Sequence, residues 1–186
     1  MKYLIVVCVL LSLSGCVTNQ LHFAAYSTEA ELAAIKGRVV QADIVQVTGG
    51  EKCTRCKESS KIVWHAANYN VGLYEGFANV PVDDWTEFTK RAVGASPTST
   101  LKTSVEIDRV FVKTWNSPDY YACEVNLTVD IAGAKYPGRS RLKLKQVGQS
   151  LIGDKLAALN AQVLDTVGLT VKAAYMNALT NYHKVH

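Results

Sequence analysis

The stretch from Tyr121 to Ile131 constrains the fold more than any other part of this chain, because apolar and polar residues alternate along it. Its odd positions hold Tyr, Cys, Val, Leu, Val and Ile, and its even positions hold Ala, Glu, Asn, Thr and Asp. Successive side chains of a strand point to opposite faces of a sheet, so this period predicts a β-strand with one dry face and one wet face. A second layer must cover the dry face.

Strands are expected on both sides of this segment. Thr103 to Trp115 is rich in β-branched and apolar residues, and its alternation changes phase near Asp108-Arg109, which predicts a β-bulge. From Arg139 to Val147 the alternation resumes, with Leu142 and Leu144 facing inward. Polar residues connect the three segments, so we expect them in one antiparallel sheet.

Two helices are predicted to accompany the sheet. From Leu151 to about Tyr182 apolar residues keep helical spacing, and Gly168 is expected to bend or weaken this helix, at about 1 kcal/mol relative to Ala. A shorter helix is expected over Pro81 to Val93, with Asp83 or Asp84 as its N-cap. A long amphipathic helix over a one-sided antiparallel sheet predicts an α+β fold, a two-layer sandwich with a second, shorter helix.

A further hairpin is predicted earlier in the chain. Arg38 to Thr48 and Ser60 to Tyr74 both have strand character, and the segment between them is polar and charged. We expect the two strands to pair as a long hairpin, with Cys53 and Cys56 near its tip.

The first sixteen residues have a different character. Lys2 precedes the apolar run from Leu4 to Leu11, which is about half of the roughly 20 residues that a transmembrane helix needs. Leu13-Ser14-Gly15-Cys16 follows directly. A cationic start, a short apolar core and small residues before a cleavage site are typical of a secretory signal. Together these residues resemble the lipobox of bacterial lipoprotein precursors.

The resemblance implies that Cys16 becomes a diacylglyceryl thioether, that the chain is cut after Gly15, and that the new N-terminus is acylated, for example with palmitate. Several acyl chains make a lasting membrane anchor, whereas one chain is marginal. Val17 stands where an Asp is associated with retention in the inner membrane. The expected location is therefore the outer membrane of the cell envelope, with the protein lipid-anchored and facing the periplasm.

The chain then divides into a signal peptide over 1–15, a lipidated cysteine with a tether over 16–36, and a single α+β domain over 37–186. A short helix capped by Ser27 is expected within the tether. A hydrophobic content of 48% and a charged content of 19% are those of an ordinary globular domain. The net charge of +4 is too small to indicate a nucleic-acid partner.

Three cysteines remain beyond the anchor. Cys53 and Cys56 have the spacing of a redox dithiol, half of a metal site or a local disulfide. No helix is predicted after them to lower a thiol pKa, and Lys57 stands where haem attachment requires a His. A disulfide that closes the loop is the favoured interpretation, and Cys123 is expected to be a buried, inert thiol.

A basic row follows the alternating strand. Arg139, Arg141, Lys143 and Lys145 are expected on the outward face, either as a site for an anionic partner or as a solvated sheet surface. A turn centred between Ala134 and Lys135 would place Asp130 opposite Arg139 and Glu124 opposite Lys145.

No catalytic pattern stands out. The four histidines are dispersed, and the chain has no Gly-x-Ser-x-Gly elbow, phosphate-binding glycine loop or His-Glu-x-x-His. We expect no catalytic residues, metal or cofactor, and a non-enzymatic lipoprotein that binds or helps assemble an envelope component, either protein or lipid. The alternatives are a thiol-disulfide redox protein using Cys53 and Cys56, or a module that carries a lipid or another ligand between helix and sheet.

Overall fold

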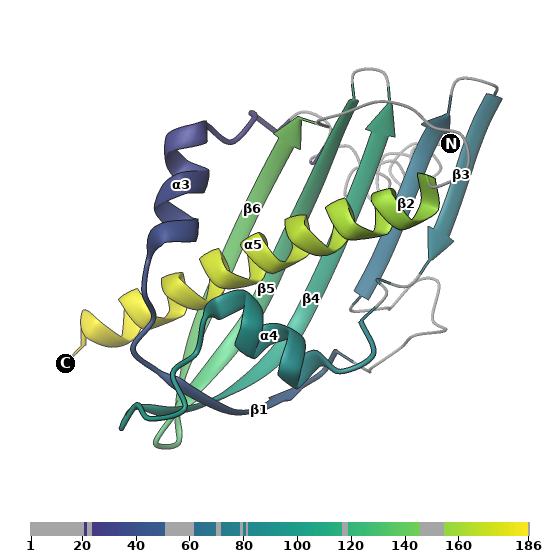
Figure 1. Cartoon of the computed structure of the whole chain (residues 1–186). Coiled ribbons are helices and arrows are strands. Elements are labelled where there is room, and N and C mark those ends of the chain that lie inside the picture. The colour runs from purple at the N-terminus through teal and green to yellow at the C-terminus, as the bar shows by residue number, and fades with distance from the viewer. Residues whose placement is uncertain are drawn as a thin grey trace, which may run out of the picture.

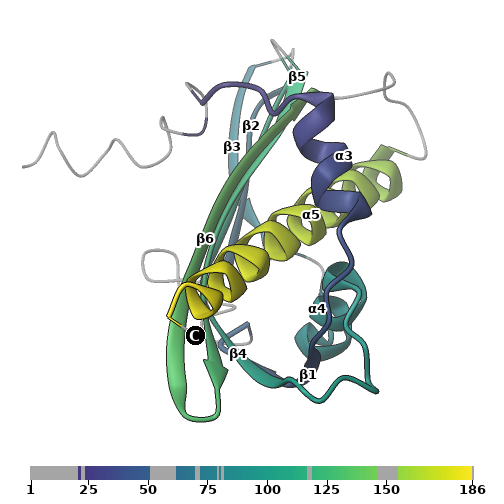
Figure 2. The ribbon, with the colours of Figure 1, turned by 90° about the vertical axis from the view of Figure 1, so that its left-hand side faces the viewer.

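The computed structural model describes residues 21, 24–50, 62–69, 72–78, 80, 82–116, 119–145 and 155–185, with the backbone alone for 62–69, 72–78, 115–116, 119 and 155–160. A twisted sheet forms one layer, and α3 (Glu29–Gly37), α4 (Trp85–Val93) and α5 (Lys155–His183) lie on one side of it (Figures 1 and 2). The α+β two-layer sandwich expected from the sequence is confirmed.

The sheet is mixed because two of its strands run parallel to β4 (Lys102–Asn116). The strand order is β3 (Gly72–Ala78), β2 (Ile62–Tyr69), β4, β5 (Asp119–Ile131) and β6 (Ala134–Lys145), and β1 (Asp43–Thr48) also pairs with β4. The β4–β5–β6 part is antiparallel, as predicted. Residues Tyr121 to Ile131 alternate as expected, and their odd positions lie in the main core.

The predicted hairpin between Arg38–Thr48 and Ser60–Tyr74 is wrong. The first segment supplies β1, which pairs with the start of β4, and the second supplies β2, which pairs with β4 beyond Val110. The pairing of β1 with β4 ends just before Gly49. This glycine has a positive φ and lies so close to the Ile107 carbonyl that a Cβ would clash. Ile107 also begins the β4 bulge that the sequence predicted. The bulge thus separates the two stretches of β4 on which β1 and β2 pair.

The turn between β5 and β6 sets the register of the outer strands. Ala132 and Gly133 both have positive φ, as a two-residue hairpin turn requires, and the Asp130 carboxylate accepts a 2.8 Å hydrogen bond from the Gly133 amide. This turn lies two residues before the predicted centre. Glu124 therefore pairs with Arg141, and Asp130 pairs with Lys135, which corrects both expected cross-strand pairs.

Helix α5 covers the inner face of β5 and β6. Its predicted apolar positions Val163, Val167, Val171, Ala174 and Ala178 are buried. The helix backbone approaches the sheet closely at Gly138, where a Cβ would clash with the Ala174 carbonyl. The interface is therefore tightly packed over these turns.

Gly168 lies inside an uninterrupted helix, at the side of α5 that faces α4. A Cβ at Gly168 would lie 3.4 Å from the Ala92 Cβ and 3.7 Å from the Phe88 ring, which are ordinary contact distances, so the packing of α4 on α5 does not require a glycine here. Helix α4 begins at Asp84, whose carboxylate accepts from the Thr86 and Glu87 amides at 2.8 and 3.0 Å. Of the two predicted caps, Asp84 is the one used.

The segment predicted to be a tether contains residues that belong to the fold. Thr28, rather than Ser27, caps α3, in a reciprocal capping box with Glu31. Ser27 pairs with the free edge of β6, since its amide donates to the Lys143 carbonyl at 2.8 Å. Lys172 of α5 donates to the Lys36 carbonyl at 3.1 Å and so holds the end of α3.

Candidate functional site

The sheet face that points away from the helices carries the predicted basic row, and we call it the outer face. Strand alternation brings Tyr120, Ala122 and Glu124 of β5 to this face. Tyr120 and Ala122 form a small apolar cluster there with Phe111 of β4 and with Leu21, which is 1% exposed. The outer face therefore has a buried apolar centre, to which residue 21 contributes.

Glu124 joins two members of the basic row. Its carboxylate accepts a 3.3 Å hydrogen bond from Arg139 and two bonds from Arg141, whose Nε lies 3.0 Å away. Burial alone would raise the pKa of Glu124, but the hydrogen bonds and charges of Arg141 and Arg139 outweigh it and hold this pKa below its usual range. The side chain of Glu124 is 10% exposed, whereas that of Arg139 is 67% exposed and still available to a ligand.

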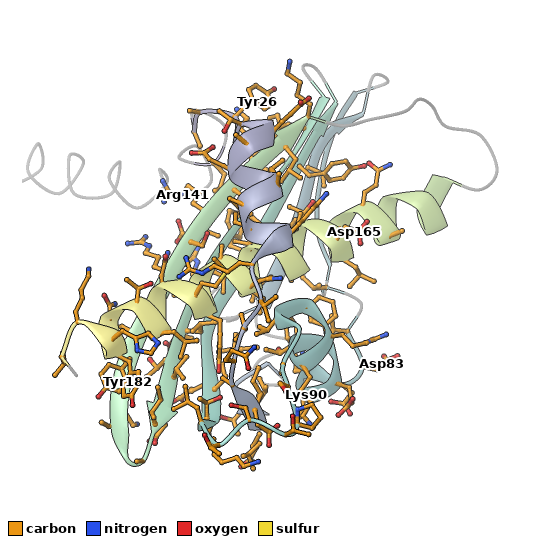
Figure 3. The ribbon with its side chains drawn as sticks, turned by 60° about the vertical axis from the view of Figure 1, so that its left-hand side comes forward. Tyr26, Asp83, Lys90, Arg141, Asp165 and Tyr182 are labelled. Carbon is orange, nitrogen blue, oxygen red and sulfur yellow. The ribbon has the colours of Figure 1, made fainter. Side chains whose placement is uncertain are left out.

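Lys143 is the buried member of the row. Its Nζ lies 4.5 Å from the Tyr120 ring centroid and 4.6 Å from that of Tyr26, and it donates to the Ala24 carbonyl at 3.1 Å. Burial lowers the pKa of Lys143. Lys145 lies 5.8 Å from the same Tyr26 ring and is exposed. Tyr26, which Figure 3 labels near the start of α3, thus connects the two lysines through cation–π contacts.

Strand β4 adds a further cation to the outer face. The Arg109 guanidinium lies over the Phe111 ring at 5.2 Å. Arg109 pairs with Asn126, and Asn126 pairs with Arg139 on the other side, so the three residues form one row across the sheet. The Nε of Arg109 and the Oδ1 of Asn126 are buried, with no hydrogen-bond partner among the described residues.

Charge is divided unequally along the outer face. Beyond the β4 bulge, the described outward-facing residues of β4–β6 include six cations and one acid, Glu124; we call this part the basic end. Four of its cations are at least partly exposed, and two are buried: the first group is Arg109, Arg139, Arg141 and Lys145, and the second is Lys113 and Lys143. The part nearer the β5–β6 turn, which we call the acidic end, carries the acids Glu106, Asp108 and Asp130 and the cations Lys102 and Lys135, and Lys102 is paired with Asp43 of β1 at 2.7 Å. The face is therefore electrically polarised along its strands.

A shallow hollow of about 170 Å³ lies at the acidic end, between β1 and β6. Its lining includes Gln46, Thr48, Glu106, Thr128 and Asp130. Among the described residues, no group of three His, Cys, Asp or Glu side chains is placed to hold a metal ion. No helix in the described part of the chain has the length and apolar character of a membrane span.

The cysteines are distributed between the core and segments that the structure does not describe. Cys16, Cys53 and Cys56 lie outside the described residues, so their expected lipidation and disulfide stay predictions. Cys123 is a buried free thiol between β5 and α5, as predicted. Burial raises the pKa of Cys123 to about 12, and a hydrogen bond with Thr170 offsets part of this rise.

Strand β1 has neighbours on both sides. β1 pairs with β4 on one side, and on the other the Val47 amide donates to the Thr86 hydroxyl of α4 at 3.3 Å. The sequence reasoning missed the contributions of Leu21, Tyr26 and Arg109 to the outer face. Only the aromatic character of Tyr26, ahead of a predicted helix cap, gave any signal for them.

Comparisons of this chain with known proteins gave the following findings. No family model matches it, and no curated protein does. A solved structure described as an uncharacterized protein is similar over 73% of this chain and 90% of its own, at 11% identity and a TM-score of 0.33.

Proposed function

We propose that this chain is a lipoprotein of the outer membrane, anchored by acylated Cys16, that faces the periplasm and binds or helps assemble another envelope component without catalysis. The lipobox residues Leu13 to Cys16 supply the basis for the anchor. The observation that carries the proposal is the position of Leu21, buried on the outer face five residues after Cys16. The folded domain thus begins almost directly after the anchor.

A binding role is supported by the outer face, where some charged side chains are held in fixed contacts and others are exposed. Glu124 is engaged by Arg139 and Arg141, and Lys143 is held by two aromatic rings and a carbonyl. Paired and fixed side chains of this kind preserve the shape of a surface. The more exposed cations, Arg139 and Lys145, remain accessible on it.

The anchor is tested by Cys16→Ala, with Cys53→Ala as the matched control. We expect Cys16→Ala to abolish incorporation of a palmitate analogue and to release the protein from membranes washed at high salt, because the thioether cannot form and salt screens electrostatic attraction. Cys53→Ala is expected to keep both properties. The lipobox interpretation fails if Cys16→Ala stays membrane-bound to the same extent as the wild type.

The binding role is tested by crosslinking in intact cells. A photo-reactive residue placed at Lys145 is expected to capture a defined envelope component, which is a lipid or a protein of the membrane that holds the anchor, and one placed at Lys90 on α4 is expected not to capture it. If both positions give the same products, or if neither captures an envelope component under several conditions, the assembly role is wrong.

A further inference from the structure

The position of the anchor limits how the domain can sit on a membrane. Residue 21 is fixed on the outer face by its contact with Phe111, Tyr120 and Ala122. Five residues of fully extended chain span at most about 18 Å, so the sulfur of Cys16 cannot be much farther than that from the outer face. Helices α4 and α5 lie on the opposite side of the sheet (Figure 2).

The charge of the outer face matches this placement. The basic end contains the residues that contact Leu21, and it carries six cations and one acid among its described residues. The acidic end lies at the other end of the strands, by the β5–β6 turn. An anionic membrane surface attracts basic groups within about 8 Å at physiological ionic strength and repels acidic ones. The two charges therefore act together to turn the basic end toward the membrane.

Tyr26 provides a third indication. Tyr26 is 36% exposed, and its ring lies beside the Lys143 and Lys145 ammonium groups. Tyrosine is favoured where a membrane meets water, because its ring is apolar and its hydroxyl is polar. An aromatic ring that adjoins two lysines near the anchor is suited to contact lipid headgroups.

We propose that the basic end of the outer face binds the anionic phospholipid headgroups of the membrane that holds Cys16, with Arg139, Arg141 and Lys145 as the main contacts. The domain then lies with its outer face toward the lipid and with α4 and α5 directed away. This inference rests on the proposed anchor. It adds to that anchor a second, electrostatic attachment that fixes the orientation of the domain.

The test uses the acylated protein reconstituted into vesicles of phosphatidylcholine, with or without added phosphatidylglycerol. Lysines are acetylated briefly and quantified by mass spectrometry. We expect phosphatidylglycerol to slow modification of Lys145 by about fivefold, the effect of one basic residue at an anionic surface. Lys90 on α4 and Lys184 after α5 are expected to react equally in both vesicles. High salt is expected to remove the protection of Lys145.

Two variants sharpen the result. Arg139→Gln removes an exposed cation while Arg141 still neutralises Glu124, and it is expected to weaken the protection of Lys145. Lys90→Gln removes the same charge from the opposite side and is expected to leave that protection unchanged. Equal modification of Lys145 in the two vesicles, or equal effects of the two variants, overturns the proposal.

A separate arm distinguishes this inference from the proposed anchor. The Cys16→Ala chain is added to preformed vesicles, and sedimentation is compared between the two lipid compositions. Greater binding with phosphatidylglycerol, weakened by Arg139→Gln, supports the headgroup site even if mass spectrometry finds no acyl chain on Cys16 of the wild type. Equal binding to both compositions counts against the headgroup site, whatever the state of Cys16.

Discussion

Glu124 offsets the mutual repulsion of the cations at the basic end. Its carboxylate is largely buried and accepts hydrogen bonds from two guanidinium groups. Removing one partner from a buried charged network leaves the others uncompensated. A single residue thus supports the shape of the whole surface.

We expect Glu124→Gln to lower the free energy of unfolding at pH 7 by about 1–3 kcal/mol, measured by urea denaturation. The matched control is Glu87→Gln, which removes an exposed partner of Lys90 in the first turn of α4 and is expected to cost at most about 1 kcal/mol. Equal losses in the two variants would show that the network around Glu124 adds nothing to stability.

The same residue predicts a dependence on pH. The pKa of Glu124 is lowered in the folded protein, so its contribution is complete above the ordinary carboxyl pKa of about 4.3 and is lost as the pH falls through the lowered value. We expect the wild type to lose more stability than Glu124→Gln between neutral pH and that acidic range. Parallel stability curves for the two proteins would contradict this assignment.

At the scale of elements, the contact between α5 and β6 depends on a missing side chain. Gly138→Ala would place a Cβ against the Ala174 carbonyl, so the helix must shift. We expect a loss of about 1–3 kcal/mol by chemical denaturation. Gly37→Ala is the control because a Cβ there meets no atom within 4 Å, and it is expected to be neutral or slightly stabilising. A neutral result for Gly138→Ala would mean that α5 has room to move.

The elements differ in how far local sequence determines them. β5, α4 and the buried stripe of α5 follow from periodicity and capping, and the bulge near Asp108 follows from a change of phase. The pairing of β1 and β2 with β4 does not follow from local sequence. An alternating pattern shows which side chains of a strand face the core, but it does not show which strand lies next to it. The β5–β6 turn was misplaced because it requires positive φ at Ala132, a residue that rarely adopts it.

The candidate site could also be predicted only in part from the sequence. The basic row on β6 is visible in the sequence, but its pairing depends on a register that the turn sets. Leu21 and Tyr26 reach the outer face through tertiary packing, whereas Arg109 reaches it through strand alternation after the β4 bulge. No local pattern connects residues that lie more than a hundred positions apart, as Tyr26 and Lys143 do.

At the scale of the whole molecule, the reactivity of the Cys123 thiol measures whether the helical layer stays packed on the sheet. Its thiol lies between β5 and α5, and its pKa of about 12 keeps it protonated at neutral pH. With Cys8, Cys16, Cys53 and Cys56 replaced by Ser, we expect no reaction with a thiol reagent in the native protein at pH 8. Reaction is expected to begin in urea together with the loss of circular dichroism. Rapid modification of the native protein would show that the layers separate locally.

The free edge of β6 has a consequence for crowded copies of this chain. The Asn177 and Asn181 side chains donate to the Arg139 and Pro137 carbonyls at 2.7 and 2.9 Å, and Ser27 occupies the Lys143 carbonyl. These carbonyls would otherwise recruit an incoming strand. With them occupied, β6 is a poor template for fibre growth even where a shared surface holds many molecules at high local concentration. The two asparagines, one helical turn apart on α5, thereby protect this strand edge from pairing with another copy of the chain.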